Sequence, residues 1–239
     1  MATTLILTAA EREARALARG LGLAWRPGSP FPAYGRDGAH PARLAPVGLR
    51  AELIAARWAA LLDGLGRPVV ISAGVCGGLA GGLAWGDLVL PAQVLGPGGD
   101  ALPVTSPLRS LALARAGGRA QAGSIATSRE VIHTPAGKAA LQARTGAVAV
   151  DMESSVILAA AAAAGCPSLV VRGVSDIATE ALPAELTDLL TSSGRLRALR
   201  AVGAALRHPR VARQALALRA HARRALDAVA AVLRTVLDA

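Results

Sequence analysis

Short apolar runs alternate with helical segments from the N-terminus to Asp176, and this alternation limits the possible folds more than any other feature. Each run is rich in Val, Ile, Leu and Ala, as expected of strands that are buried on both faces. Regular alternation of this kind predicts an α/β fold built on one mostly parallel sheet. The runs that we expect to be strands are Thr4–Ala9, Arg43–Gly48, Pro68–Ala73, Gly86–Pro91, Gly123–Thr127, Val148–Val150 and Leu169–Val171.

Helical patterns fill most of the intervals between these runs. One begins at Glu11, directly after the first run, and an alanine-rich helix follows Glu153. We expect a loop with one weak strand at Gly20–Arg43, a loop at Leu95–Pro107 and a glycine-rich turn after Ala73. The remaining predicted helices are Arg50–Leu62, Leu108–Ala116, Pro135–Thr145, Glu180–Leu190, Arg195–Leu206 and Val211–Leu237.

No linker divides the chain, so we predict a single domain over residues 1–239, of which residues 181–239 form a basic helical extension. One face of its last helix carries Leu226, Val229, Leu233 and Val236. The arginines of the whole extension are Arg195, Arg197, Arg200, Arg207, Arg210, Arg213, Arg219, Arg223, Arg224 and Arg234. Such a basic face is either a solvated surface of a packed helix or a surface that meets anionic lipid, and both interpretations stay open.

The formal charge of +10 comes almost entirely from arginine, since Lys138 is the only lysine. Arginine in place of lysine, together with abundant alanine, is typical of a genome with biased base composition. The positive charge is therefore no sign of nucleic-acid binding, and we expect no nucleic-acid partner. Cys76 and Cys166 lie far apart without metal-ligand spacing, which indicates a reducing compartment. Residues 1–10 lack the basic start of a signal peptide, and no apolar run approaches the roughly 20 residues of a membrane span. We therefore expect a cytoplasmic protein, or one that binds to a membrane surface.

Three carboxylates stand where predicted strands end. Glu13 follows the first strand, and the stretch Ala149–Asp176 contains Glu153 at its start and Asp176 at its end. Because open α/β sheets bind ligands beyond the carboxyl ends of their strands, we expect these side chains to face one pocket. For Glu13 alone, a simpler role is to complement the dipole at the start of its helix.

The other polar residues narrow the chemistry that these carboxylates can perform. No Ser–His–Asp set accompanies them, and no two histidines share ligand spacing, so we propose neither a metal nor an organic cofactor. Carboxylates that act without a metal suit the cleavage of a glycosidic bond, in which a cationic sugar forms and the leaving group takes a proton. A nucleoside is the natural substrate of that kind.

At these residues the chain resembles the nucleoside phosphorylase/nucleosidase superfamily, which implies a three-layer α/β/α fold around a mixed, mostly parallel sheet. Val150–Ser154 (VDMES) is similar to its ribose-binding motif, and Arg172–Asp176 (RGVSD) to its purine-binding motif. The resemblance implies that Met152 packs on the ribose, that Glu153 binds the ribose hydroxyls as an anion, and that Asp176 promotes protonation of the purine.

Two more segments resemble the methylthioadenosine/S-adenosylhomocysteine nucleosidases of this superfamily. They are the loop Thr8–Glu13 and the glycine-rich segment Ile71–Ala80. The resemblance gives Glu13 the role of activating water, beside a water or phosphate pocket at Thr8 and Gly74. The further substrate-binding residues that it implies are Val75, Cys76, Gly77, Val131, Ile132 and Ser175.

The chain also departs from these relatives. Val131 stands where an aromatic ring would cover the purine, and the loop Leu95–Pro107 is short. Neither the first loop nor the glycine segment carries the arginine with which the phosphorylases hold phosphate. Phosphorolysis is therefore not supported by the sequence, although phosphate stays open as a co-substrate, bound by the amides of Gly74–Gly78.

The region from Pro135 to Ser154 and the Ala/Arg/Leu-rich end resemble the hopanoid-associated phosphorylases. That branch implies removal of adenine from adenosylhopane, a lipid-linked nucleoside, by a homodimer or higher homo-oligomer. Two alternatives remain: a nucleosidase that acts on methylthioadenosine-like or futalosine-like substrates, and a non-catalytic protein that binds a nucleoside or a membrane.

Overall fold

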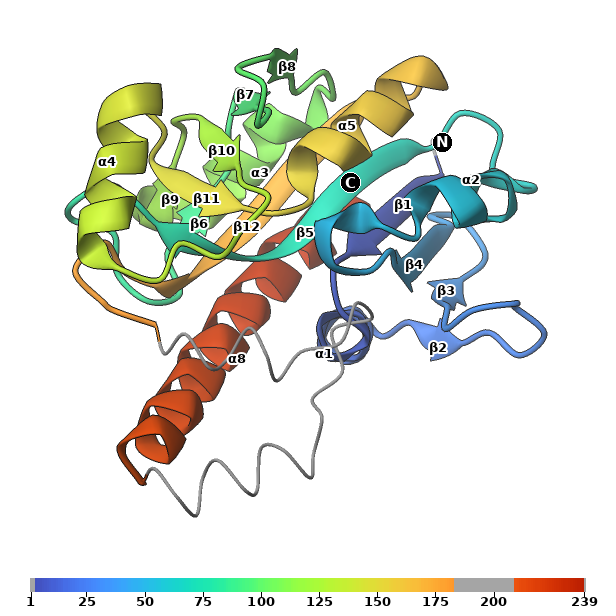
Figure 1. The fold of residues 1–239 in the computed structure, drawn as a ribbon. Helices are drawn as coiled ribbons and strands as arrows, with labels where there is room; N and C mark the ends of the chain where they lie inside the picture. The colour runs from blue at the N-terminus through green and yellow to red at the C-terminus, as the bar shows by residue number, and fades with distance from the viewer. Residues whose placement is uncertain (1–2, 183–208, 239) are drawn as a thin grey trace.

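A mixed sheet runs through the part of the chain that the computed structural model describes, residues 3–182 and 209–238 (Figure 1). Its strands are β1 (Thr4–Thr8), β2 (Ala24–Trp25), β3 (Tyr34–Arg36), β4 (Ala42–Pro46), β5 (Val69–Gly78), β6 (Leu88–Val89), β7 (Gln93–Leu95), β8 (Ala101–Pro103), β9 (Ala120–Gln121), β10 (Ile125–Thr127), β11 (Ala149–Asp151) and β12 (Ser168–Asp176). The main order is β2-β3-β4-β1-β5-β11-β10-β7-β8, with β12 paired to β5 and β6, and β9 paired to β6. Strands β4, β1, β5 and β12 lie side by side in this order and are parallel to one another. This arrangement confirms the predicted mixed, mostly parallel sheet.

Helices cover both faces of this sheet (Figure 1). They are α1 (Glu11–Leu21), α2 (Ile54–Leu62), α3 (Leu108–Ala116), α4 (Pro135–Thr145), α5 (Ser154–Ala163) and α8 (Pro209–Leu237), with short 3-10 turns η1 (Leu49–Ala51) and η2 (Gly117–Arg119). Side chains alternate along each strand, so Ile6 of β1 packs with α1 and α8, whereas Leu5 and Leu7 pack with α2 and α5. The result is the three-layer α/β/α arrangement.

Strand β5 is longer than the sequence predicts, because it continues from the expected end at Ala73 through the glycine cluster to Gly78. Glycine usually weakens a strand. Here β12 pairs with residues as far as Gly77 on one side, and β11 pairs with Gly77 and Gly78 on the other. The turn is therefore confined to Gly81 and Gly82, while Gly74, Gly77 and Gly78 belong to a strand and let other groups lie close to its backbone.

Two further predictions need correction. The helix expected at Arg50–Leu62 begins only at Ile54, because Arg50 and Ala51 adopt positive φ angles of 56° and 54° in η1. The expected loop Leu95–Pro107 contains most of the antiparallel β7–β8 pair. The helices expected at Glu180–Leu190 and Arg195–Leu206 lie largely or wholly outside the described residues. The prediction of a single domain with an extension at 181–239 stays a prediction.

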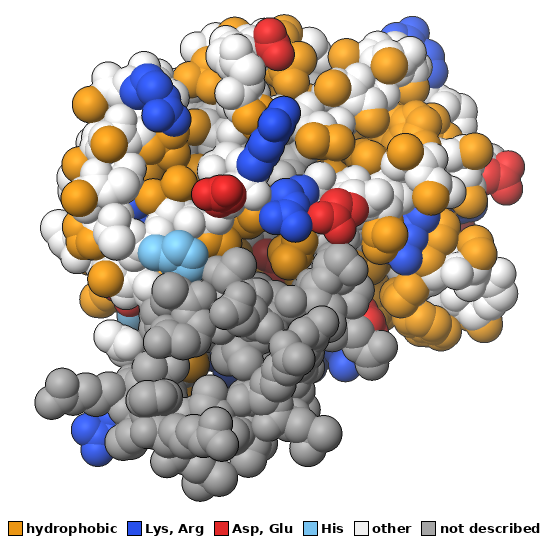
Figure 2. Space-filling model, in the orientation of Figure 1, with side chains coloured by type: hydrophobic (Ala, Val, Ile, Leu, Met, Phe, Trp, Pro, Cys, Tyr) orange, Lys and Arg blue, Asp and Glu red, His pale blue; other side chains and the backbone are white. Residues whose placement is uncertain are grey.

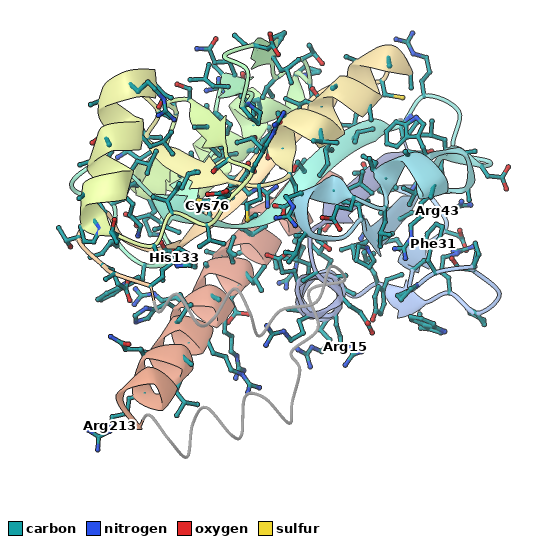
Figure 3. The ribbon with its side chains drawn as sticks, viewed as in Figure 1. Arg15, Phe31, Arg43, Cys76, His133 and Arg213 are labelled. Carbon is teal, nitrogen blue, oxygen red and sulfur yellow. The ribbon has the colours of Figure 1, made fainter. Side chains whose placement is uncertain are left out.

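Helix α8 packs along the sheet face that also carries α1, and the four apolar residues of its predicted stripe are all buried. Its N-terminal end projects from the body of the protein, as the position of Arg213 shows (Figure 3). No helix of the described residues is long and apolar enough to cross a membrane. On the described part of the face in Figure 2, arginine and carboxylate side chains are interspersed rather than separated by sign.

The contact between α8 and β12 leaves no room for a side chain at Gly173. A Cβ atom there would lie 2.6 Å from the Ala225 carbonyl oxygen and 2.8 Å from the Ala225 Cβ. We expect Gly173→Ala to lower the free energy of unfolding by about 1–3 kcal/mol, because α8 must move away from the sheet. Urea unfolding measures this change. Gly81→Ala is the matched control, since a Cβ at Gly81 meets nothing within 4 Å. Equal stability of the two variants would contradict the close packing of α8.

Candidate active site

The candidate residues gather where β1, β5, β11 and β12 end, on the side of the sheet from which α1 and α5 start. Glu13 lies in the first turn of α1, Glu153 directly precedes α5, and Asp176 is the last residue of β12. Between them runs the glycine-rich half of β5, where Cys76 lies near the centre of the molecule (Figure 3). The topology therefore brings together three carboxylates that are far apart in sequence.

A buried arginine lies at one end of this site. We call this end, formed by Glu13, Asp151, Glu153 and Arg172, the sugar end, after the role that the sequence resemblance implies for it. The side chains of Arg172 and Asp151 are both 1% exposed, and Nη2 of the arginine lies 2.9 Å from Oδ2 of the aspartate. Arg172 also donates to the hydroxyl oxygens of Ser72 at 2.8 Å and Ser154 at 3.1 Å. Burial alone would lower the pKa of Arg172, but the charges of Asp151, Glu153 and Glu13 raise it. The arginine is therefore a fixed cation that lies among three carboxyl groups.

Glu13 accepts hydrogen bonds from two backbone amides, whereas its role in activating water stays a prediction. Its Oε2 accepts a hydrogen bond from the Ala10 N–H at 3.2 Å, as a residue at the start of a helix does. Its Oε1 accepts from the Val75 N–H at 3.1 Å, which places the carboxylate against β5. A Cβ at Gly74 would lie 2.9 Å from this Oε1 and 2.8 Å from Nη1 of Arg172. Gly74 thus gives the two charged groups room to approach each other.

Glu153 is 4% exposed, and its Oε1 accepts from the Arg50 N–H at 3.1 Å. This bond accounts for the unusual backbone of η1. Burial raises the pKa of Glu153 to about 8; Asp151 and Glu13 act in the same direction, against Arg172 at 3.8 Å and the Arg50 N–H. The raised pKa favours the protonated form of Glu153 near neutral pH, whereas its role as an anion toward the sugar stays a prediction.

Asp176 lies at the other end of the site, which we call the base end after the role that the sequence resemblance implies for it. Its Oδ1 accepts from the Ser175 hydroxyl at 2.9 Å, and its Oδ2 lies 2.6 Å from Nζ of Lys138. A Cβ at Gly77 would lie 2.9 Å from Oδ2, so the glycine is what lets the carboxylate lie against β5. The sequence reasoning missed Lys138 as a partner, although its being the only lysine was a usable signal.

The remaining predicted residues lie around these two ends. Thr8 ends β1 and donates to the Ala10 carbonyl at 3.3 Å, and Met152 is half-buried beside Glu153. Cys76 is buried between the ends: burial raises the pKa of its thiol, Arg172 acts against this shift, and both Asp151 and Asp176 add to it. Ser175 also donates to the Cys76 carbonyl at 3.2 Å. The other members, Val75, Val131 and Ile132, are half-buried.

A separate cavity and possible metal sites are the other places to consider where the described residues could hold a ligand. A cavity of about 610 Å³ lies at the opposite end of β12, where Arg67, Leu158 and Ser168 are among its lining residues, and it contains none of the candidate site residues. Within residues 3–182 and 209–238, no three His, Cys, Asp or Glu side chains are placed to hold a metal ion. The expectation that the protein uses no metal and no cofactor stays a prediction.

Comparisons with known proteins agree with this arrangement. A family model described as the phosphorylase superfamily matches residues 5–208. A futalosine hydrolase mutant of Helicobacter pylori superposes with a TM-score of 0.73 at 18% identity, covering 100% of this chain and 99% of that one. The 5′-methylthioadenosine/S-adenosylhomocysteine nucleosidase of S. pneumoniae, solved with a transition-state inhibitor, gives 0.74 at 19% identity, with 99% of each chain covered.

A third similar structure is the 5′-methylthioadenosine/S-adenosylhomocysteine nucleosidase of Neisseria meningitidis, with a TM-score of 0.72, 20% identity and coverage of 99% and 98%. At these identities the likenesses show the fold. A search of curated proteins found no match. The family match confirms the superfamily that the two motifs indicated, whereas the hopanoid-associated branch stays a prediction.

The protonated state of Glu153 gives a measurable pH dependence of stability. Between its ordinary pKa of 4.5 and its raised pKa of about 8, the folded protein holds a proton that the unfolded chain has lost, so this residue destabilises the fold as the pH rises through that window. Glu153→Gln mimics the protonated acid and avoids the loss. We expect the melting temperature of the variant to gain at least about 3 °C on wild type between pH 5 and pH 8, since 1 kcal/mol corresponds to about 2–4 °C.

The exposed Glu52, which pairs with Arg50 at the surface, provides the control. Glu52→Gln should follow the wild-type curve over the same pH range. A constant difference between Glu153→Gln and wild type from pH 5 to pH 8 would show that Glu153 is ionised throughout.

Proposed function

The chain belongs to the phosphorylase superfamily, and we propose that it is an enzyme that cleaves the N-glycosidic bond of an adenine nucleoside. The observation that carries the proposal is the pair of buried ends on either side of Cys76. At one end three carboxyl groups surround a single arginine, and at the other an anchored carboxylate faces the backbone of β5 at Gly77. The first suits a sugar that becomes cationic, and the second suits a base that must take a proton.

The reaction follows from these contacts. Adenine lies at the base end, with its N7 edge toward Asp176, while the ribose packs on Met152 and its hydroxyls bind Glu153. As the C1′–N9 bond breaks, its electron pair goes to the base, and a proton passes through Asp176 to N7. Positive charge then develops at C1′ beside the carboxyl groups of the sugar end, where the low dielectric strengthens its stabilisation.

The same charges favour water over phosphate as the acceptor. A phosphate at Gly74 would have to lie beside Glu13 and close to Asp151, and Arg172 already donates to or pairs with groups of the protein. One amide of this segment is also committed, since the Val75 N–H binds Glu13, and Gly77 and Gly78 lie in register with β11. We therefore propose hydrolysis, in which Glu13 accepts the proton of the attacking water.

The test is adenine release by chromatography, with the sugar product identified by mass spectrometry. We expect wild type to release adenine at the same rate with and without phosphate and to give the free ribosyl product. Asp176→Asn should lower kcat by about 10²–10⁴-fold, as removal of a positioned acid does, and Glu13→Gln should do likewise. Melting curves check that both variants fold. Asp176→Asn activity near that of wild type would overturn the assignment, and strict phosphate dependence would overturn the role of Glu13.

For the substrate itself we propose adenosylhopane, so that the enzyme acts in hopanoid biosynthesis. The support is the resemblance of Pro135–Ser154 and of the C-terminal region to the hopanoid-associated branch, together with two further features. The segment Leu95–Pro107 is shorter than the substrate-covering segment of the nucleosidases it resembles, so we expect room for a long 5′ substituent. The projecting part of α8 exposes Leu216 at 65% and carries Arg213 and Arg219, a combination suited to an anionic membrane surface.

Comparing substrates tests this choice. We expect faster adenine release from a lipid-linked adenosine in anionic vesicles than from methylthioadenosine or futalosine. Replacing Arg213 and Arg219 by serine should reduce vesicle sedimentation and leave turnover of small nucleosides unchanged. Faster turnover of a small nucleoside would favour the methylthioadenosine- or futalosine-type alternative, and binding without any turnover would favour the non-catalytic one. A homodimer or higher homo-oligomer stays part of the proposal, and light scattering determines it.

A further inference from the structure

The base end contains a feature that the proposed reaction leaves unexplained: both oxygens of Asp176 already accept hydrogen bonds. Oδ1 accepts from the Ser175 hydroxyl and Oδ2 from Nζ of Lys138, at 2.9 and 2.6 Å. The Ser175 hydroxyl has a single proton, which the Cys76 carbonyl and Oδ1 of Asp176 share as acceptors, whereas the Lys138 ammonium donates directly to Oδ2. The 2.6 Å contact makes this ammonium group the nearest source of a proton for Asp176.

Lys138 is the group in that position. Its side chain is 1% exposed, and it lies on the inward face of α4 with the buried Leu141. Besides Asp176, its Nζ donates to the Ile177 carbonyl at 2.7 Å and to the Glu180 carbonyl at 3.1 Å. Three acceptors thus surround the three protons of one ammonium group, which fixes both the lysine and the segment that follows β12.

The residue type is informative because every other basic residue of the chain, apart from histidine, is arginine. A planar guanidinium does not match three oxygens that converge on one point, whereas an ammonium does. Arginine also keeps its charge at all ordinary pH values, while a buried lysine can give up a proton. The geometry therefore favours lysine over arginine at this position.

We propose that Lys138 is a positioning residue that orients Asp176 and holds the proton which Asp176 passes to the leaving adenine; this rests on the proposed function. An Nζ–H bond breaks as an Oδ2–H bond forms, that proton moves on to N7, and the C1′–N9 electron pair goes to the base. Neutral adenine leaves, Asp176 is again a carboxylate, and Lys138 is an amine that regains its proton from water after release.

Other titratable groups lie near this pair. Cys76 faces Asp176 from β5, and burial raises the pKa of its thiol, so it keeps its proton over the range tested below. Behind Lys138, the Glu180 carboxylate accepts from the Trp85 indole N–H at 2.9 Å and lies 4.0 Å from Nδ1 of His221. The His221 ring in turn stacks on Trp85 at 4.1 Å between ring centroids. Glu180, His221, His133 (whose carbonyl accepts from the Leu182 N–H) and Glu153 (whose pKa is raised to about 8) are thus the groups that could mimic an effect of Lys138 on the pH profile.

The test compares pH profiles of adenine release from pH 5 to pH 9. The wild-type profile is the reference for every variant, because Glu153 titrates near pH 8 in all of them. Lys138→Met, which keeps the length of the stem, should lose about 100-fold at pH 8 and recover as the pH falls and Asp176 takes protons from water. Lys138→Arg keeps the charge and should show the same loss. In the Asp176→Asn background, Lys138→Met should cause no further loss.

Arg144→Met, which removes an exposed cation from the same helix, and His221→Gln are the controls and should keep the wild-type profile. Three results would each overturn the proposal. They are a Lys138→Met profile parallel to that of wild type, full activity of Lys138→Arg, and a shift of the alkaline limb of the pH profile in His221→Gln. Should Lys138→Met fail to fold, Lys138→Arg decides. Absence of adenine release by wild type would instead mean that the proposed function has failed, so the two failures are distinguishable.

Discussion

One buried guanidinium, that of Arg172, makes the rest of the site possible. Three carboxyl groups lie near it, and without a cation among them their burial would cost several kcal/mol for each charge. The protein compensates in two ways. Arg172 pairs with Asp151 where both are almost inaccessible, and burial raises the pKa of Glu153 to about 8, which favours its neutral form. Both effects limit the uncompensated negative charge that is buried at the sugar end.

The sheet supports this electrostatic arrangement through the glycine-rich half of β5. Gly74 leaves space for Arg172 and Glu13, and Gly77 leaves space for Asp176, so both ends of the site lie against one continuous strand. That strand is held on one side by β12, which carries Arg172 and Asp176 themselves. The distance between the sugar end and the base end is thereby set by backbone pairing rather than by a mobile loop, which suits a substrate with two parts of fixed separation.

Much of this could be predicted from the sequence, because strand–helix alternation and carboxylates at strand ends are local patterns. The fold class, most strands and the gathering of Glu13, Glu153 and Asp176 followed from them. The partners of those carboxylates did not follow, since Lys138 and Arg172 meet their carboxylates only through tertiary packing. The extended β5 was missed for a related reason: glycines interrupt strands unless neighbours pair on both sides, and pairing is not visible in one segment. The protonation of Glu153 depends on burial, which sequence spacing does not give.

The central claim is that the two ends described above bind one adenine nucleoside between them. A crystal structure of the Asp176→Asn variant with a bound adenine nucleoside tests it most directly. The account predicts adenine against residue 176 and Gly77, the ribose on Met152 with its hydroxyls at Glu153, and a water molecule between Glu13 and C1′. A nucleoside bound with its base at the sugar end, or in the cavity at the opposite end of β12, would contradict it.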